Sequence, residues 1–278
     1  MINDYLEPED YVEPRCVLCG DAYGAMPEVK SVPQQRIVAK MDEYMAHRDY
    51  AGAERHLLYW LEEAELGHDL RGQLMLRNEL AGHYRKVQDK KNATLNAEKA
   101  LELLKALDFE GTISAGTTYV NAATVMNAFG EDERSLELFG KARTVYENAP
   151  RTDKALLGGL YNNMALTYTS LGRYGEASEL YEKALLVMRS VPGGKLEQAI
   201  TYLNMADMYG KMKGEENAEK EIFACLDRAE SLLAGNDGAD DGYYAFVMEK
   251  CAPTFAHYGY FMTAETLRKK AEEIYARA

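Results

Sequence analysis

The sequence predicts an all-α protein, an α-solenoid of about six stacked antiparallel helix pairs. One pattern of residues recurs at intervals of about 42 positions, and each repeat holds two apolar stripes at helical spacing, separated by a helix-breaking residue. Small residues stand at a fixed distance from each other in the two stripes. A period of roughly 20 to 50 residues built from helix–turn–helix units is typical of solenoids, in which each unit packs only on its neighbours.

The six pairs, called units one to six, align on one position in the first helix and one in the second. In the first helix this position is Met41, Ala81, Ala123, Ala165, Ala206 and Ala252, at spacings of 40, 42, 42, 41 and 46 residues. In the second helix it lies 12 positions later, at Ala53, Ala93, Ser135, Ala177, Ala218 and Ala264. Two helix axes approach within about 8–10 Å only where the contacting side chains are short. We therefore expect the two positions of each unit to face each other.

Residues 1–33 do not fit the repeat. They hold four prolines and the sequence Cys16-Val-Leu-Cys19, and we expect an extended arm. The repeat domain then spans residues 34–278. In unit one, Trp60 stands where most other units have alanine, which predicts a wider joint between units one and two.

Unit four shows the pattern most clearly. Its first stripe is Tyr161, Met164, Ala165, Tyr168 and Leu171, and its second is Leu180, Tyr181, Ala184, Leu185 and Met188. Gly172 ends the first helix as a C′ glycine would, and residues 192–194 (Pro-Gly-Gly) end the second. The polar run 234–242 predicts a loop that explains the longest spacing. Pro253 predicts a kink or a delayed start in the first helix of unit six.

This pattern resembles the tetratricopeptide repeat (TPR) family, in the longer form of about 42 residues found in kinesin light chains. The resemblance covers residues 34–278 and is carried by Tyr119, Asn121, Ala123, then Tyr161, Asn163, Ala165, Gly172, then Tyr202, Asn204 and Ala206. It implies a right-handed superhelix whose first helices line a concave groove. It also implies a module that binds proteins or peptides.

Composition narrows the class of partner. The net charge is −13 and the pI is near 5.0, which argues against nonspecific binding to nucleic acid or to anionic membranes, because both need basic surface. The sequence holds no run of about 18 apolar residues and its acidic start does not resemble a signal peptide. Four cysteines are too few for a secreted disulfide framework. We expect a cytoplasmic protein.

Three asparagines, Asn121, Asn163 and Asn204, occupy one equivalent position, two residues before the small residue of the first helix. Two residues correspond to about 200° around a helix, so these side chains should point away from the second helix and into the groove. Asparagine carries a donor and an acceptor and can pair with an extended peptide backbone. Their expected groove neighbours are Glu79, Lys86, Thr124, Asp207 and Lys211. The alternative is that each asparagine bonds a neighbouring helix and has only a structural role.

The Cys16-x-x-Cys19 spacing suits half of a zinc site, and a glycine follows that permits a tight turn. A structural zinc site needs four ligands, and the sequence holds no second pair of this kind. A redox pair and a passive turn are the alternatives. No other metal or cofactor is predicted.

No catalytic residue is predicted, because the five histidines are scattered over different units and no nucleotide-binding or hydrolase motif is present. The first hypothesis for function is therefore a scaffold or adaptor that grips an extended peptide in the groove. The alternatives are a structural or oligomerisation module, such as a homodimer, and a metal- or redox-responsive adaptor that uses the Cys16–Cys19 arm.

Overall fold

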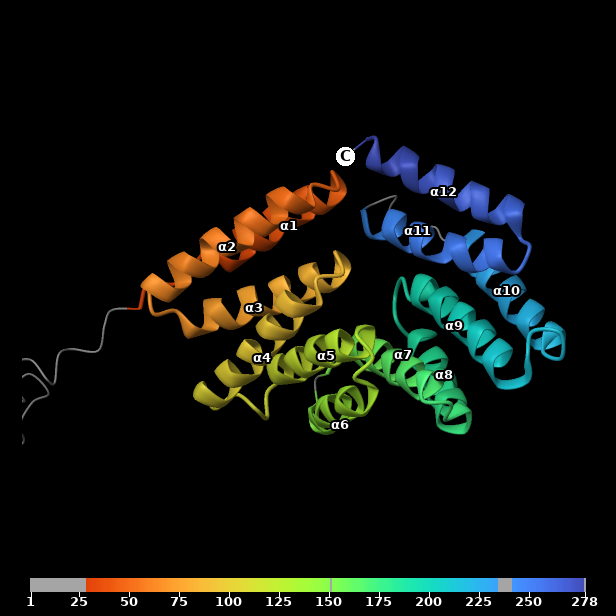
Figure 1. The fold of residues 1–278 in the computed structure, drawn as a ribbon, viewed down its shortest axis with the longest axis horizontal. Helices are drawn as coiled ribbons and strands as arrows, with labels where there is room; N and C mark the ends of the chain where they lie inside the picture. Colours follow the sequence, from red (N-terminus) through yellow and green to blue (C-terminus); the bar gives the residue numbers. More distant parts are fainter. Residues whose placement is uncertain (1–28, 151, 235–241, 278) are drawn as a thin grey trace, which may run out of the picture.

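The computed structural model describes residues 29–150, 152–234 and 242–277, and these residues form twelve α-helices and no strand. The helices are α1 (Gln34–Ala46), α2 (Tyr50–Leu66), α3 (Leu70–Lys86), α4 (Lys90–Ala106), α5 (Ile113–Ala128), α6 (Asp132–Asn148), α7 (Lys154–Ser170), α8 (Tyr174–Met188), α9 (Lys195–Lys213), α10 (Glu219–Ala234), α11 (Gly242–His257) and α12 (Phe261–Tyr275). Units one to six are the successive pairs from α1–α2 to α11–α12. The prediction of an all-α array of six helix pairs is confirmed (Figure 1).

The aligned positions lie in the core. The alanines and Ser135 at these positions are at most 1% exposed, and Met41 is 7% exposed. Ala165 and Ala177, which belong to the tightly packed pair α7 and α8, are both fully buried. Short side chains at these points allow the two helices of a unit to approach closely. The repeat register derived from the sequence is therefore the one that the fold uses.

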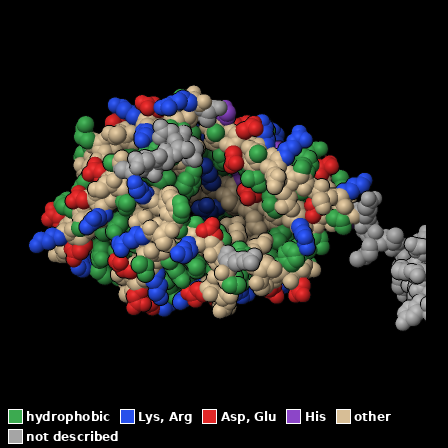
Figure 2. Space-filling view, turned by 180° about the vertical axis from the view of Figure 1, so that it is seen from behind, with side chains coloured by type: hydrophobic (Ala, Val, Ile, Leu, Met, Phe, Trp, Pro, Cys, Tyr) green, Lys and Arg blue, Asp and Glu red, His purple; other side chains and the backbone are tan. Residues whose placement is uncertain are grey.

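The array curves until its two ends meet. Figure 1 shows the six pairs following one another around an arc, with α1 and α2 coming back toward α11 and α12. Helices α1 and α11 are in contact although they belong to the first and last units. Seen from the other side in Figure 2, the molecule is hollowed at its centre. The first helices of the units form the concave side, and the contact between units one and six, here called the seam, closes the ring.

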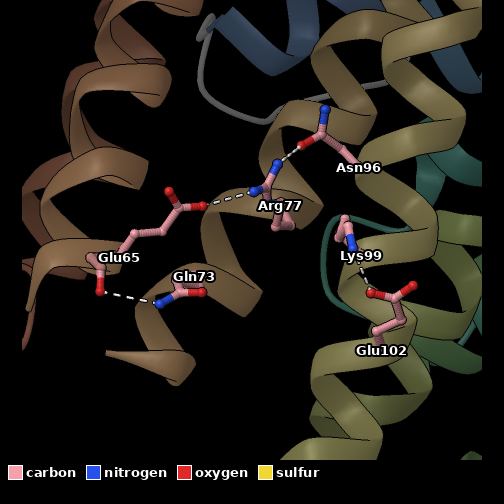
Figure 3. Close-up of polar contacts among 7 residues, drawn as sticks. Glu65, Gln73, Arg77, Asn96, Lys99 and Glu102 are labelled. Carbon is pink, nitrogen blue, oxygen red and sulfur yellow. Dashed lines mark hydrogen bonds and ion pairs between the residues drawn. The ribbon is translucent and has the colours of Figure 1, made fainter. Parts of the chain in front are cut away.

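A polar contact ties the first two units together. Arg77 of α3 donates one hydrogen bond to the Glu65 carboxylate of α2 (2.8 Å) and another to Oδ1 of Asn96 on α4 (2.9 Å). Nearby, Gln73 donates to the carbonyl oxygen of Ala64 (3.2 Å). Figure 3 shows Arg77 between the two neighbouring helices. Asn96 is almost fully buried and receives a charged donor there, as a buried polar group requires.

Two details differ from the sequence-based expectations. Helix α11 begins at Gly242, ten positions before Ala252, and runs through Pro253 to His257, so the predicted delayed start is wrong. Pro253 lies on an exposed face, where water can solvate the carbonyl group that its missing N–H leaves without a helical bond. In unit five the second helix begins at Glu219, so the aligned residue Ala218 precedes it, although Ala218 is fully buried.

Trp60 is half-buried and packs edge-on against Tyr59 and His56 of its own helix.

Cys16 and Cys19 lie outside the described residues, as does most of the predicted 234–242 loop. In the part of the chain that the structure describes, no helix is long and apolar enough to cross a membrane.

Candidate binding surface on the concave side

Two cavities open on the concave side. The larger one, about 650 Å³, lies at the seam and is here called the seam cavity. Its walls include Asp42, Met45, Lys86, Tyr243, Phe246 and Tyr275. The second, about 360 Å³, is the groove cavity, between α3 and α5. Its walls include Met75, Asn78, Glu79, Thr117, Thr118 and Asn121. Two of the predicted groove residues, Glu79 and Asn121, are thus brought to one cavity, and Lys86 to the other.

Asn121 is bonded to the preceding unit. Its Nδ2 donates to Oδ1 of Asn78 (3.2 Å). Asn78 in turn donates from its own Nδ2 to the Leu74 carbonyl oxygen and to Oγ1 of Thr118, both at 3.0 Å. These bonds hold Asn121 in one orientation at the wall of the groove cavity.

Asn204 repeats this arrangement two units further along. Its Nδ2 donates to Oδ1 of Asn162 at 3.0 Å. Asn78 and Asn162 both lie three residues before the small residue of their helices, and each faces the asparagine of the next unit. This second position is not among the predicted groove residues, although the recurrence of Asn78 and Asn162 at it is visible in the sequence.

Asn121 and Asn204 therefore make the bond to a neighbouring helix that the structural alternative for these asparagines predicted. The physical reason is that neighbouring first helices lie close enough on the concave side for short amide side chains to reach across. Each of the two still has an oxygen that accepts no hydrogen bond from the described residues. Both can still accept a hydrogen bond from a ligand.

Asn163 differs from the other two. Its half-exposed side chain makes no hydrogen bond with any residue that the structure describes. The cause lies in unit three, where Val120 takes the position that Asn78 and Asn162 occupy in units two and four. Valine offers no acceptor. Asn163 therefore keeps both its donor and its acceptor available on the concave side.

Glu79 and Asp42 are two carboxylates without a hydrogen bond or ion pair to other described residues. Glu79 contacts water, but the walls of the concave side surround it, and this partial desolvation raises its pKa. The neighbouring negative charge of Asp42 raises the pKa of Glu79 further. The two acids make this part of the surface attractive to a cation.

Of the remaining predicted groove residues, Lys86, Thr124 and Asp207 already have intramolecular partners. The Lys86 ammonium group lies 5.0 Å from the Tyr50 ring centroid and 5.2 Å from that of Phe246. Oγ1 of Thr124 donates to backbone carbonyl groups of its own helix, at 2.6 and 2.9 Å, so its hydroxyl hydrogen is not free for a ligand.

On α9, Asp207 accepts a hydrogen bond from Oη of Tyr258 at 3.2 Å. Burial raises the pKa of Asp207, and this hydrogen bond opposes the rise. Lys211 is exposed one turn away on the same helix and makes no ion pair with described residues. These two residues lie on a different part of the ring from the groove cavity.

Among residues 29–150, 152–234 and 242–277, no group of three or more histidine, cysteine or acidic side chains could hold a metal ion. Cys225 and Cys251 are buried and unpaired, and burial raises the pKa of both thiols, to about 11 and about 12. They pack as small apolar residues.

Comparison with known proteins agrees with this architecture. Residues 156–231 match the family model of the tetratricopeptide repeat. This part of the chain therefore consists of tetratricopeptide repeats. The matched segment covers most of units four and five, where the sequence pattern is clearest, and the predicted TPR resemblance is confirmed.

Two solved structures share the TPR arrangement. The crystal structure of BtubC (BKLC) from P. vanneervenii matches with a TM-score of 0.61 and 20% identity, over 74% of this chain and 82% of BtubC. A Rap protein complexed with Competence and Sporulation Factor matches with a TM-score of 0.53 and 14% identity, over 87% of this chain and 63% of the Rap protein. At these identities the likeness concerns the fold alone. No curated protein sequence matches the chain.

Proposed function

We propose that this TPR protein is a non-catalytic scaffold that holds an extended segment of a partner protein, or a free peptide, along its concave side. The observation that carries the proposal is the free amide of Asn163, which lies among equivalent asparagines that the fold holds in place. A side chain with one donor and one acceptor matches both groups of a peptide unit.

In this proposal the bonded asparagines, Asn121 and Asn204, act only as hydrogen-bond acceptors for the peptide, and not as both donors and acceptors. Asn121 and Asn204 are oriented by Asn78 and Asn162 and would each offer one oxygen to a backbone N–H group. Groups that are already ordered lose little conformational entropy when a ligand binds. Selectivity for the ligand's side chains would come from Glu79 and Lys86 on α3 and from Asp207 and Lys211 on α9.

The two cavities support the same location. Both open on the concave side, and both have walls that combine apolar side chains with a few polar groups, as ligand sites usually do. The Rap protein that shares the fold is complexed with Competence and Sporulation Factor. By analogy with this shared fold, we propose that the concave side of this chain also binds a ligand.

The test begins with ligands selected from a library of random peptides displayed on phage, with the full chain immobilised. Fluorescence anisotropy then compares the affinity of the selected peptides for the unmodified chain and for two variants. We expect Asn163→Ala to weaken binding about five- to tenfold, the equivalent of one hydrogen bond. Asn148→Ala is the matched control, because Asn148 is exposed on α6 and its side chain bonds only the backbone of Thr144.

Equal affinities for the two variants would contradict a role for Asn163, and failure to select any peptide would contradict the proposal as a whole. A third variant separates binding from stability. Asn204→Ala removes the bond to Asn162 and should lower the free energy of unfolding by about 0.5–1.5 kcal/mol, whereas Asn163→Ala should leave it unchanged.

A further inference from the structure

The seam joins residues that are far apart in the sequence. Nη2 of Arg48, in the turn between α1 and α2, lies 3.0 Å from Oε1 of Glu249 on α11, 201 residues away. The Arg48 guanidinium group also lies 4.4 Å from the centroid of the Tyr275 ring on α12. Tyr275 donates a hydrogen bond to Oε2 of the same glutamate at 3.4 Å. These three side chains, here called the latch, form a closed set of contacts between the first and last units.

A second contact crosses the seam beside the latch. Lys86 of unit two reaches over Phe246 of α11 while it also lies over Tyr50 of α2. Both sets of contacts are polar or cation–π in nature. Neither of them buries an aliphatic core of the kind found between successive units.

The seam is therefore built differently from the joints between consecutive units. The joints contain alanine and leucine side chains that are almost fully buried. At the seam, the side chains of Arg48 and Glu249 remain 44% and 50% exposed, and Tyr243 and Phe246 are 50% and 37% exposed. A cavity of about 650 Å³ lies between the two units beside these contacts. Exposed ion pairs contribute little free energy and are weakened by salt, so closure of the ring is weakly held.

We propose that the seam is a gate that controls access to the concave side. The ring opens between unit one and unit six, admits a partner segment from the side, and closes again when the latch re-forms. This proposal rests on the proposed function, because it is the entry of a peptide segment that the gate would regulate. A closed ring can be threaded only by a free chain end, whereas an opened ring can receive an internal loop of a folded partner.

Opening can be measured without any ligand, by double electron–electron resonance between nitroxide labels on either side of the seam. The labels are placed at Ala51→Cys on α2 and Glu272→Cys on α12, both at exposed positions, in a Cys16→Ser/Cys19→Ser background. Cys225 and Cys251 are buried and remain unlabelled. The full chain should show a short distance at low salt, together with a minor longer one.

The Arg48→Ala variant should raise the ratio of the long to the short distance by about fivefold or more, because it removes both latch contacts of the guanidinium group. The matched control is Arg55→Ala, an exposed arginine on α2 that makes no ion pair or ring contact with described residues, and it should leave the ratio unchanged. Sodium chloride at about 1 M should move the unmodified chain in the same direction as Arg48→Ala. Equal distributions for the two variants, or no response to salt, would overturn the gate.

A kinetic measurement then connects the gate to binding. A selected peptide is presented as an internal loop of a folded carrier protein, and its association rate is measured by stopped flow. We expect Arg48→Ala to accelerate association relative to Arg55→Ala, and equal rates would show that the seam does not control entry. Because the distance measurement uses no peptide, failure of the gate and failure of the peptide-binding proposal can be told apart.

Discussion

The turns of units one and two use different residues from the turns of units four and six, although the backbone ends each helix in the same way. In both regions a residue with positive φ follows the helix, and the next residue donates its backbone N–H back to the last turn. Asp69 bonds the carbonyl oxygen of Ala64 in this manner, and Arg173 bonds that of Tyr168, both at 2.9 Å. The geometry is that of a Schellman motif.

The residues that achieve this geometry are different. In the first three turns of the array the positive-φ residues are Arg48, His68 and Gln88, with φ of 54°, 52° and 62°. Each is followed by an aspartate whose side chain caps the next helix, at Asp49, Asp69 and Asp89. In units four and six the positive-φ residues are Gly172 and Gly259, and no side-chain cap follows them.

The comparison shows that one turn can be stabilised in two ways. A non-glycine residue at positive φ costs about 1–2 kcal/mol, and an aspartate cap offsets a similar amount. Glycine avoids the strain and leaves the following helix without a side-chain cap. A rule that searches for glycine finds the turns of units four to six and overlooks those of units one and two.

Removal of the most buried aspartate cap should have the largest effect on the free energy of unfolding. Asp69 is 4% exposed and accepts hydrogen bonds from the backbone N–H groups of Gly72 and Val32, both at 2.9 Å. Asp69→Ala leaves both donors without their partner, and we expect the free energy of unfolding to fall by about 2–4 kcal/mol. Urea denaturation measures it. Asp153→Ala is the control, since Asp153 is exposed and caps only Ala155, and it should cost about 1 kcal/mol. Equal losses would show that burial of the cap is unimportant.

A core substitution in the glycine-turn region should come next. Ala165→Leu or Ala177→Leu overpacks the contact between α7 and α8, and each should lower the free energy of unfolding by about 1–3 kcal/mol. Thermal unfolding followed by circular dichroism provides the measurement. Unchanged stability in both variants would mean that the helices of unit four do not meet at these residues.

An exchange of the two turn types should have smaller effects of opposite sign. Gly172→Ala should destabilise the protein by about 1 kcal/mol through backbone strain alone, because a Cβ at this position would meet no other atom. Gln88→Gly should relieve similar strain and stabilise the protein by up to about 1 kcal/mol. If the two variants changed the denaturation midpoint in the same direction, the equivalence of the two turns would be disproved.

The smallest effect on the free energy of unfolding should appear only at acidic pH. It concerns His83, which lies in the region where aspartate follows the turns. Burial lowers the pKa of His83 below its ordinary value of 6.5, and its Nδ1 has no hydrogen-bond partner among the described residues. The unfolded chain therefore takes up this proton at higher pH than the folded chain does, so the free energy of unfolding falls as the pH drops below about 6.5. His83→Phe should reduce this dependence, as followed by urea denaturation at pH 7 and pH 5. The exposed His68→Asn should not, and an unchanged dependence in His83→Phe would exclude His83 as its cause.

The sequence by itself determined the six helix pairs and their register. Helical periodicity and the offset of 12 residues between small positions are local properties, so residues such as Ala81 and Ala93 could be assigned to the core without knowledge of the fold. It also indicated the concave position of Glu79 and Asn121, because the face of a helix follows from residue spacing.

Only the tertiary structure decided which asparagines are free. That outcome depends on what the preceding unit places opposite each one: Asn78 opposite Asn121, but Val120 where Asn163 would need a partner. Closure of the ring was likewise beyond the sequence. Arg48 meets Glu249 because small rotations at five successive joints add up to the curvature of the ring. That curvature depends on all five joints and cannot be predicted from the pattern within a single repeat.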